Sequence, residues 1–109
     1  MAAGSPEISV RDNTESSCYE ALIGGEAVGA IVYERAGPRL VILHTIVDPE
    51  CRGRGIGATL VRRALDDVRS GGMTLTNYCG FVSAFITGHP GYAGLIDAEH
   101  PGRPHGSRR

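Results

Sequence analysis

Three glycines alternate with arginines and an apolar residue in one short stretch, CRGRGIGA, at residues 51–58. An apolar, β-branched run precedes it and an amphipathic helical pattern follows, so the stretch is predicted to lie at a helix N-terminus. The first backbone N–H groups of a helix lack internal partners and carry partial positive charge, so they bind anions. Glycines let the backbone approach a ligand, and arginines add bidentate donors. The pattern predicts a phosphate-binding turn; the alternative is a loop whose glycines only permit tight turning.

Two known phosphate-binding motifs were weighed for this turn. A P-loop is excluded because no Gly-Lys-Ser/Thr follows the glycines. The residues from Gly53 to Ala58 do match the dinucleotide fingerprint G-x-G-x-x-G/A. That fingerprint belongs to a βαβ unit with an acidic residue about 20 positions later. Here the preceding strands are predicted to be hairpin-linked, and the next strand has no acid at its end. Dinucleotide binding is therefore the less favoured alternative.

The elements that must position this turn follow from hydrophobic periodicity. Strand patterns cover residues 7–12, 18–23, 27–35, 40–47 and 73–78, and helical spacing covers about 55–70 and a short segment around 81–86. Gly24-Gly25 is a two-residue hairpin signal. The run at 40–47 is apolar on both faces, as in a covered central strand. The order predicts an α+β fold with a mostly antiparallel, twisted sheet of about five strands and two helices.

Composition bounds the class of protein. The 109 residues carry a formal net charge of -1 and are 41% hydrophobic, which fits one domain and argues against a general nucleic-acid binder. No apolar run is long enough to span a membrane, and no secretory signal is visible. Three widely spaced cysteines fit neither a disulfide framework nor a metal site. We therefore expect a cytoplasmic protein without a metal, with neither nucleic acid nor membrane as a partner.

The chain is predicted to consist of three parts. Residues 1–6 are expected to form a flexible N-terminus and residues 7–96 the folded domain. Residues 97–109 are rich in Gly, Pro, Arg and His and lack an apolar period, so they predict a disordered basic tail.

Two motifs resemble a known family. The residues from Arg52 to Gly57 are similar to the R/Q-x-x-G-x-G/A signature of the GCN5-related N-acetyltransferases. The stretch that begins at His44-Thr45, together with the downstream C-FV…HP-Y pattern from Cys79 to Tyr92, resembles the small single-domain bacterial and plant branch of that family. The resemblance covers residues 7–96. Two positions depart from it, since Asn77 stands where the branch usually has proline and Gly91 where it often has glutamate.

The resemblance implies acetyl-coenzyme A as cosubstrate. Its pantetheine arm would lie between two splayed strands and pair with the backbone near Ile46 and Val47, and its pyrophosphate would sit on the amides of the glycine turn. The implied cofactor-binding residues are Ile46, Val47, Arg52, Gly53, Arg54, Gly55, Ile56, Gly57 and Ala58. Asn77, at the end of its predicted strand, is a further candidate because its side chain could form a hydrogen bond with the coenzyme.

Cys79 and His44 are the candidate catalytic residues. Cys79 precedes the short helix, whose dipole favours a thiolate that could accept an acetyl group; alternatively it lines the acetyl pocket or is an inert apolar residue. By strand alternation His44 shares a face with Leu40, Ile42 and Ile46. It could act as a base, directly or through a water, or be a structural histidine.

We therefore expect an acetyl-CoA-binding N-acetyltransferase that transfers an acetyl group to a primary amine. The acceptor is unknown and could be a small molecule or a protein lysine, and the protein is expected to be a monomer or weak dimer. The alternatives are a non-catalytic acyl-CoA-binding module, a dinucleotide-binding protein and a small interaction domain without a ligand.

Overall fold

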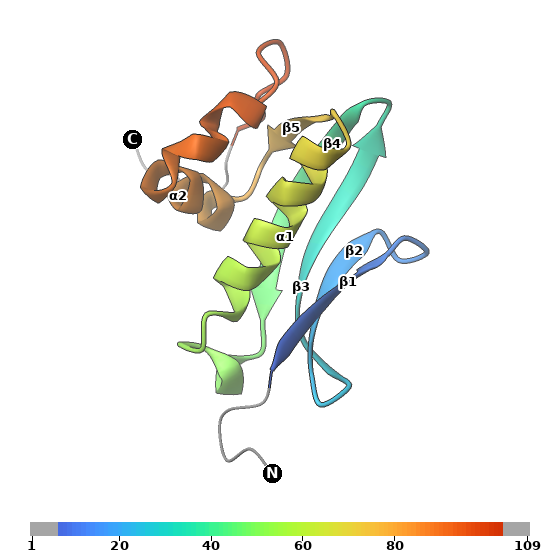
Figure 1. Cartoon of the computed structure of the whole chain (residues 1–109), viewed down its shortest axis with the longest axis vertical. Coiled ribbons are helices and arrows are strands. Elements are labelled where there is room, and N and C mark those ends of the chain that lie inside the picture. Colours follow the sequence, from blue (N-terminus) through green and yellow to red (C-terminus); the bar gives the residue numbers. More distant parts are fainter. Residues whose placement is uncertain (1–6, 104–109) are drawn as a thin grey trace.

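The structure, a computed structural model, describes residues 7–103 and contains one five-stranded sheet (Figure 1). The strands lie in sequence order: β1 (Ile8–Asn13), β2 (Cys18–Ile23), β3 (Glu26–Ala36), β4 (Arg39–Val47) and β5 (Thr74–Asn77). The first four are antiparallel, whereas β5 runs parallel to β4 because a helix crosses over between them. The predicted α+β class with a mostly antiparallel sheet is confirmed.

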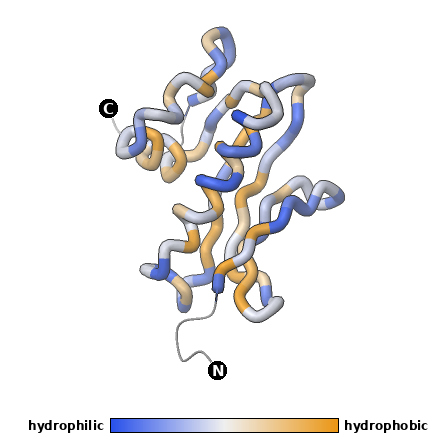
Figure 2. The backbone as a smooth tube through the Cα atoms, viewed as in Figure 1, coloured by the Kyte–Doolittle hydropathy of each residue, from blue (hydrophilic) through white to orange (hydrophobic). Residues whose placement is uncertain are grey.

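Two α-helices and two short 3₁₀ turns complete the described fold; one turn precedes α1 and the other follows α2. These helical segments are η1 (Pro49–Cys51), α1 (Ile56–Ser70), α2 (Gly80–Gly88) and η2 (Pro90–Leu95). Helix α1 buries one side against the sheet, through Ile56, Gly57, Leu60, Val61, Ala64, Leu65 and Val68. In Figure 2, hydrophobic colour accordingly runs along the central strands and alternates with hydrophilic colour along α1. Within the described residues, no helix is long and apolar enough to cross a membrane.

Strand β4 contains an irregularity at Leu43. Tyr33 of β3 pairs with Ile42, and the preceding residue, Val32, pairs with His44. Leu43 is therefore an extra residue without a partner on β3, which is a β-bulge. Because side chains alternate along a strand, one extra residue exchanges the two faces for everything that follows it.

The bulge decides where His44 points. Thr45 pairs with Ile31, whose side chain is fully buried on the face covered by α1, so Thr45 faces α1. His44 is exposed on the opposite face, which we call the open face of the sheet. The prediction that His44 shares a face with the buried residues before the bulge, such as Ile42, is wrong; it shares a face with Ile46. Simple alternation fails here because the bulge depends on the pairing with β3.

The pairing of β4 with β5 stops halfway along β4. Residues 39–42 pair with residues 74–77, and the last contact is the Tyr78 N–H donating to the Ile42 carbonyl over 2.8 Å. We call residues 39–42 of β4 the paired half and residues 43–47 the open half. Among residues 7–103, only β3 pairs with the open half.

The segment after η2 lies along the free edge of β5. The Asp97 N–H donates to the Leu75 carbonyl over 2.8 Å, and the Asn77 N–H donates to the Pro101 carbonyl over 2.9 Å. The Thr76 hydroxyl also donates to a carbonyl of this segment. The prediction of a disordered tail from residue 97 is therefore wrong for residues 97–103. The remaining tail residues 104–109 and the predicted flexible residues 1–6 lie outside the described residues.

Candidate active site

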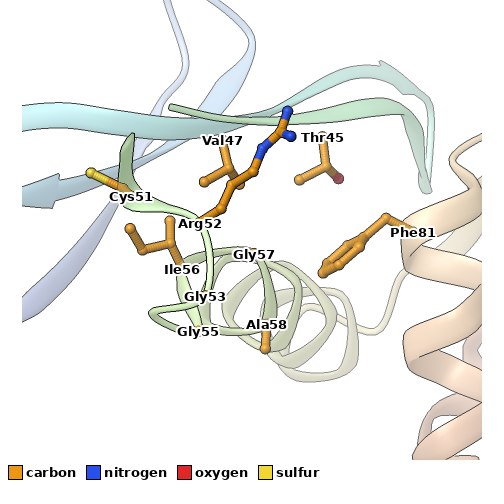
Figure 3. Close-up of a pocket in the computed structure, with 10 residues that line it drawn as sticks. All are labelled: Thr45, Val47, Cys51, Arg52, Gly53, Gly55, Ile56, Gly57, Ala58 and Phe81. Atoms are coloured by element: carbon orange, nitrogen blue, oxygen red, sulfur yellow. The ribbon is translucent and has the colours of Figure 1, made fainter. Parts of the chain in front are cut away.

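A cavity of about 440 Å³ lies between the open half of β4, the glycine turn, the first turn of α1 and the start of α2 (Figure 3). Its lining residues are Thr45, Val47, Cys51, Arg52, Gly53, Gly55, Ile56, Gly57, Ala58 and Phe81. Most of the predicted cofactor-binding residues are thus gathered around one cavity. In Figure 3 the Arg52 side chain extends from the loop toward β4 across this space.

The glycine turn leaves the start of α1 without a side-chain cap. Gly53 and Gly55 have φ angles of 85° and 77°, in the left-handed region that residues with a Cβ rarely adopt. A Cβ at either position would meet no atom within 4 Å, so the backbone conformation, not crowding, requires glycine there. Within residues 7–103, no side chain accepts a capping hydrogen bond from the first turn of α1. An uncapped helix start bordering a cavity has the features that binding of a phosphate group needs.

At Gly57 the limit is contact with a side chain and not backbone conformation. A Cβ at this position would lie 2.7 Å from Cζ of Phe81, because the phenyl ring packs directly on the first turn of α1. The ring ties α2 to α1 and is still 49% exposed at the cavity wall. Phe81 is therefore part of the candidate site, although the sequence analysis assigned it only to a helix.

Cys79 lies just behind the cavity wall. It is the residue before α2 and is only 5% exposed, and its Sγ lies 3.3 Å from Oγ1 of Thr45, which lines the cavity. Cys79 itself is not among the residues that line the cavity, whereas its neighbour Thr45 is. Of the roles that the sequence left open for Cys79, lining the pocket is therefore not seen, and its role as an acetyl acceptor stays a prediction.

Asn77 holds the backbone of Cys79 and does not line the cavity. Its Oδ1 accepts the Cys79 N–H over 2.9 Å, and its Nδ2 donates to the Cys79 carbonyl over 3.0 Å. The side chain is buried and both ends of its amide are engaged by one neighbour. The predicted cofactor contact of Asn77 is therefore replaced by a local one that fixes the turn between β5 and α2.

Three other predicted site residues lie outside the cavity lining. Arg54 is exposed on the loop, and the Ile46 side chain is 53% exposed on the open face. The contact expected at Ile46 involves its backbone, which belongs to the open half of β4. His44 also lies on the open face, so it can act only on a group that reaches that face.

Sequence reasoning missed three lining residues: Thr45, Cys51 and Phe81. Each left a signal. Cys51 directly precedes the glycine turn, and Phe81 is an aromatic residue in the first turn of a helix. Thr45 is the one hydroxyl in an otherwise apolar stretch of strand, but its face depends on the bulge. Among the described residues, no group of three or more His, Cys, Asp or Glu side chains could hold a metal ion.

The fold is shared with solved N-acetyltransferases. A GCN5-like protein from Staphylococcus aureus, solved by NMR, is 18% identical with a TM-score of 0.61 over 95% of this chain and 99% of that one. The ribosomal-protein-S18-alanine N-acetyltransferase from Escherichia coli is 14% identical with a TM-score of 0.58 over 66% of this chain. The PaiA N-acetyltransferase from Thermoplasma acidophilum, in complex with coenzyme A, is 18% identical with a TM-score of 0.50 over 68% of this chain.

The match to the larger enzymes is partial. The chain covers 50% of the E. coli enzyme and 48% of the T. acidophilum enzyme. Among curated proteins, none matches the sequence significantly. A family model described as GCN5-related N-acetyl-transferase matches residues 18–95. Because that match spans well over half of the chain, this protein belongs to the GCN5-related N-acetyltransferase family.

Proposed function

We propose that the protein binds acetyl-CoA in the cavity beside the open half of β4 and transfers the acetyl group to a primary amine. One observation carries the proposal: β4 continues past the end of β5, and its open half forms a cavity wall next to the uncapped start of α1. The family to which the chain belongs uses acetyl-CoA.

The cavity has different chemistry at its two ends. At the glycine turn, the first N–H groups of α1 and the Arg52 guanidinium suit the phosphates of coenzyme A. Along the open half of β4, the backbone groups that no described strand pairs can bind the two amides of the pantetheine arm. An arm in this position directs the thioester toward Thr45 and the Cys79 sulfur behind it.

We further propose that Cys79 carries the acetyl group between the two substrates. Its thiolate attacks the thioester carbonyl, so that a C–S bond to Cys79 forms as the C–S bond to coenzyme A breaks. The leaving coenzyme A thiolate takes up the proton that Cys79 has lost. The amine then attacks the acyl-cysteine and gives up a proton, and the Cys79 thiol is regenerated.

His44 fits the role of the base in the second step if the amine approaches from the open face. Residues 44 and 45 are adjacent, and their side chains lie on opposite faces of the same strand. An acetyl group at the open edge of β4 would then lie between the face of the sheet with the thiol and the face with the imidazole. The neutral imidazole accepts the proton that the attacking amine must lose.

Ligand-induced stabilisation tests the binding step. We expect acetyl-CoA and CoA, but not NAD, to raise the thermal midpoint, since a ligand of the native state stabilises by RT ln(1 + [L]/Kd). Gly55→Ala should lower the midpoint of the free protein and abolish the CoA effect. Gly37→Ala is the matched control, because Gly37 also has a left-handed φ, 62°, with open space around it, and lies in the β3–β4 hairpin. A shift by NAD alone, or equal CoA effects in both variants, would contradict the proposal.

Intact mass after exposure to acetyl-CoA tests the covalent step. The 109 residues contain no lysine, so an acetyl adduct cannot arise from the side-chain amine that is usually modified. We expect one adduct that is released by hydroxylamine, as a thioester is, and that is lost in Cys79→Ala. Stabilisation by CoA without transfer to any amine would instead favour the second candidate function, a non-catalytic acyl-CoA-binding module.

A further inference from the structure

The Cys79 sulfur has a specific polar neighbour. Among the described residues, Thr45 is the only side chain with a hydrogen bond to Sγ, at a distance of 3.3 Å from Oγ1. Cys79 is 5% exposed, so water does not compete freely for this contact. Thr45 also lines the cavity, so the residue that contacts the sulfur borders the space that a ligand would occupy.

Stability does not explain a hydroxyl at this position. The nearest side chains on the same face are apolar: Ile31 directly opposite on β3, Ile42 before the bulge and Val47 after Thr45. A partly buried hydroxyl costs free energy unless a good partner compensates it, and a neutral thiol is a weak partner. Valine has nearly the same shape as threonine and would fill this place in the wall without that cost.

Thr45 and Asn77 hold different parts of Cys79. The Asn77 amide holds the N–H and the carbonyl of Cys79, so the start of α2 is locked at its backbone. Thr45 then holds the tip of the side chain. The bulge at Leu43 is what gives this place to Thr45, because without it the neighbouring His44 would face α1.

We propose that Thr45 is the positioning residue for Cys79: its hydroxyl donates a hydrogen bond to the thiolate and aims the sulfur at the cavity. A hydrogen bond to a charged acceptor is stronger than one between neutral groups, so the contact favours the reactive thiolate over the thiol. A role of Thr45 in catalysis rests on the proposed function. The effect of Thr45 on the reactivity of the Cys79 sulfur does not depend on it.

Alkylation of the free protein by iodoacetamide, followed for each cysteine by peptide mass across a pH series, tests the proposal without acetyl-CoA. In Thr45→Val we expect the Cys79 rate near neutral pH to fall by about tenfold, the weight of one charge-assisted hydrogen bond. The pH profile should move to higher pH. Thr45→Ser keeps the hydroxyl and should restore both. Thr87→Val is the matched control, since it removes an exposed hydroxyl from α2 whose one hydrogen bond within residues 7–103 goes to the Ser83 carbonyl.

The pH profile separates positioning from simple access. A change in access alters the Cys79 rate equally at every pH, whereas loss of the hydrogen bond moves the profile. Cys51 and Cys18 serve as internal references in every variant, and Thr45→Ala replaces Thr45→Val if the valine variant does not fold. An unmoved profile in Thr45→Val, or a serine variant as slow as the valine variant, would overturn the proposal. Absence of CoA binding would overturn the proposed function and leave this result standing.

Discussion

The two halves of β4 differ in what surrounds them. The paired half lies between β3 and β5, and its residues Leu40 and Ile42 are 1% and 0% exposed in the core. In the part of the chain that the structure describes, the open half pairs with β3 alone; Thr45 and Val47 line a cavity while the neighbouring Ile46 is half exposed. Strand β4 therefore has two roles. Where it is paired on both sides it contributes to stability, and where it is paired on one side its free edge is available to a ligand. The bulge and the end of β5 mark the boundary.

The largest effect is expected in the paired half. Ile42→Ala should lower the free energy of unfolding by about 2–5 kcal/mol, because it leaves a cavity in a fully buried site. Chemical denaturation measures this loss. Val47→Ala is the comparison in the open half, where we expect a loss of about 1 kcal/mol or less and weaker binding of acetyl-CoA. Equal losses of stability in the two variants would remove the distinction between the halves.

A change in the open half should affect the reaction and leave stability unchanged. In His44→Gln we expect acetyl transfer to an amine to slow by about 100-fold, the lower range for loss of a general base. Because the side chain is exposed, the unfolding free energy should stay within about 0.5 kcal/mol. Acylation of Cys79 by acetyl-CoA should continue, since it does not need the base. A wild-type transfer rate would remove His44 from the mechanism.

The segment that lies beside β5, residues 97–103, is expected to contribute to the stability of the paired half. Gly102 has a φ of 87°, and a Cβ there would collide with the backbone of Asn77. Gly102→Ala should therefore cost about 1–3 kcal/mol of stability, as for other strained backbone positions. Gly94→Ala, with open space around it, is the control and should be nearly neutral. If Gly102→Ala weakened acetyl-CoA binding without loss of stability, the segment beside β5 would serve the ligand site and not the paired half of β4.

The smallest effect concerns alkaline pH. Burial and a hydrogen bond donated to Asp12 raise the pKa of Tyr33, which pairs with Ile42, to about 12. Because the folded pKa lies above the unfolded value near 10, this stability is complete below pH 10 and is lost as the pH rises toward 12. Burial also raises the pKa of Tyr19, so Tyr33→Phe should reduce the alkaline loss without abolishing it. Urea unfolding between pH 8 and pH 12 measures the difference, and identical slopes would contradict the assignment.

Most of the fold was predictable from the sequence because its signals are local. Helical periodicity placed a helix over residues 55–70, and the structure has it at Ile56–Ser70. The hairpin glycines and the apolar runs located the strands. Residues 97–103 were missed because they are held by backbone hydrogen bonds to the edge of β5, which side-chain composition does not show.

The candidate site was predicted less completely. The residues of the glycine turn were found because repeated glycines in a sequence directly indicate an unusual backbone conformation. The orientation of His44 and Thr45 was not, because it depends on how β4 pairs with a strand far away in sequence. Asn77 was assigned to the cofactor because an amide next to a predicted site gives no sign of its local partner.

The open half of β4 also has a consequence for solubility. Unpaired N–H and C=O groups on a strand are a template on which another extended chain can add, and proteins usually guard such edges with charges or proline. Residues 43–47 contain neither a charged residue nor a proline, although Asp48 and Pro49 follow directly, and the half-exposed Ile46 lies on this edge. A pantetheine arm that pairs with the same groups would cover the template. The empty protein is therefore expected to self-associate more readily than the CoA-loaded one, so that the cosubstrate would also protect the protein from aggregation.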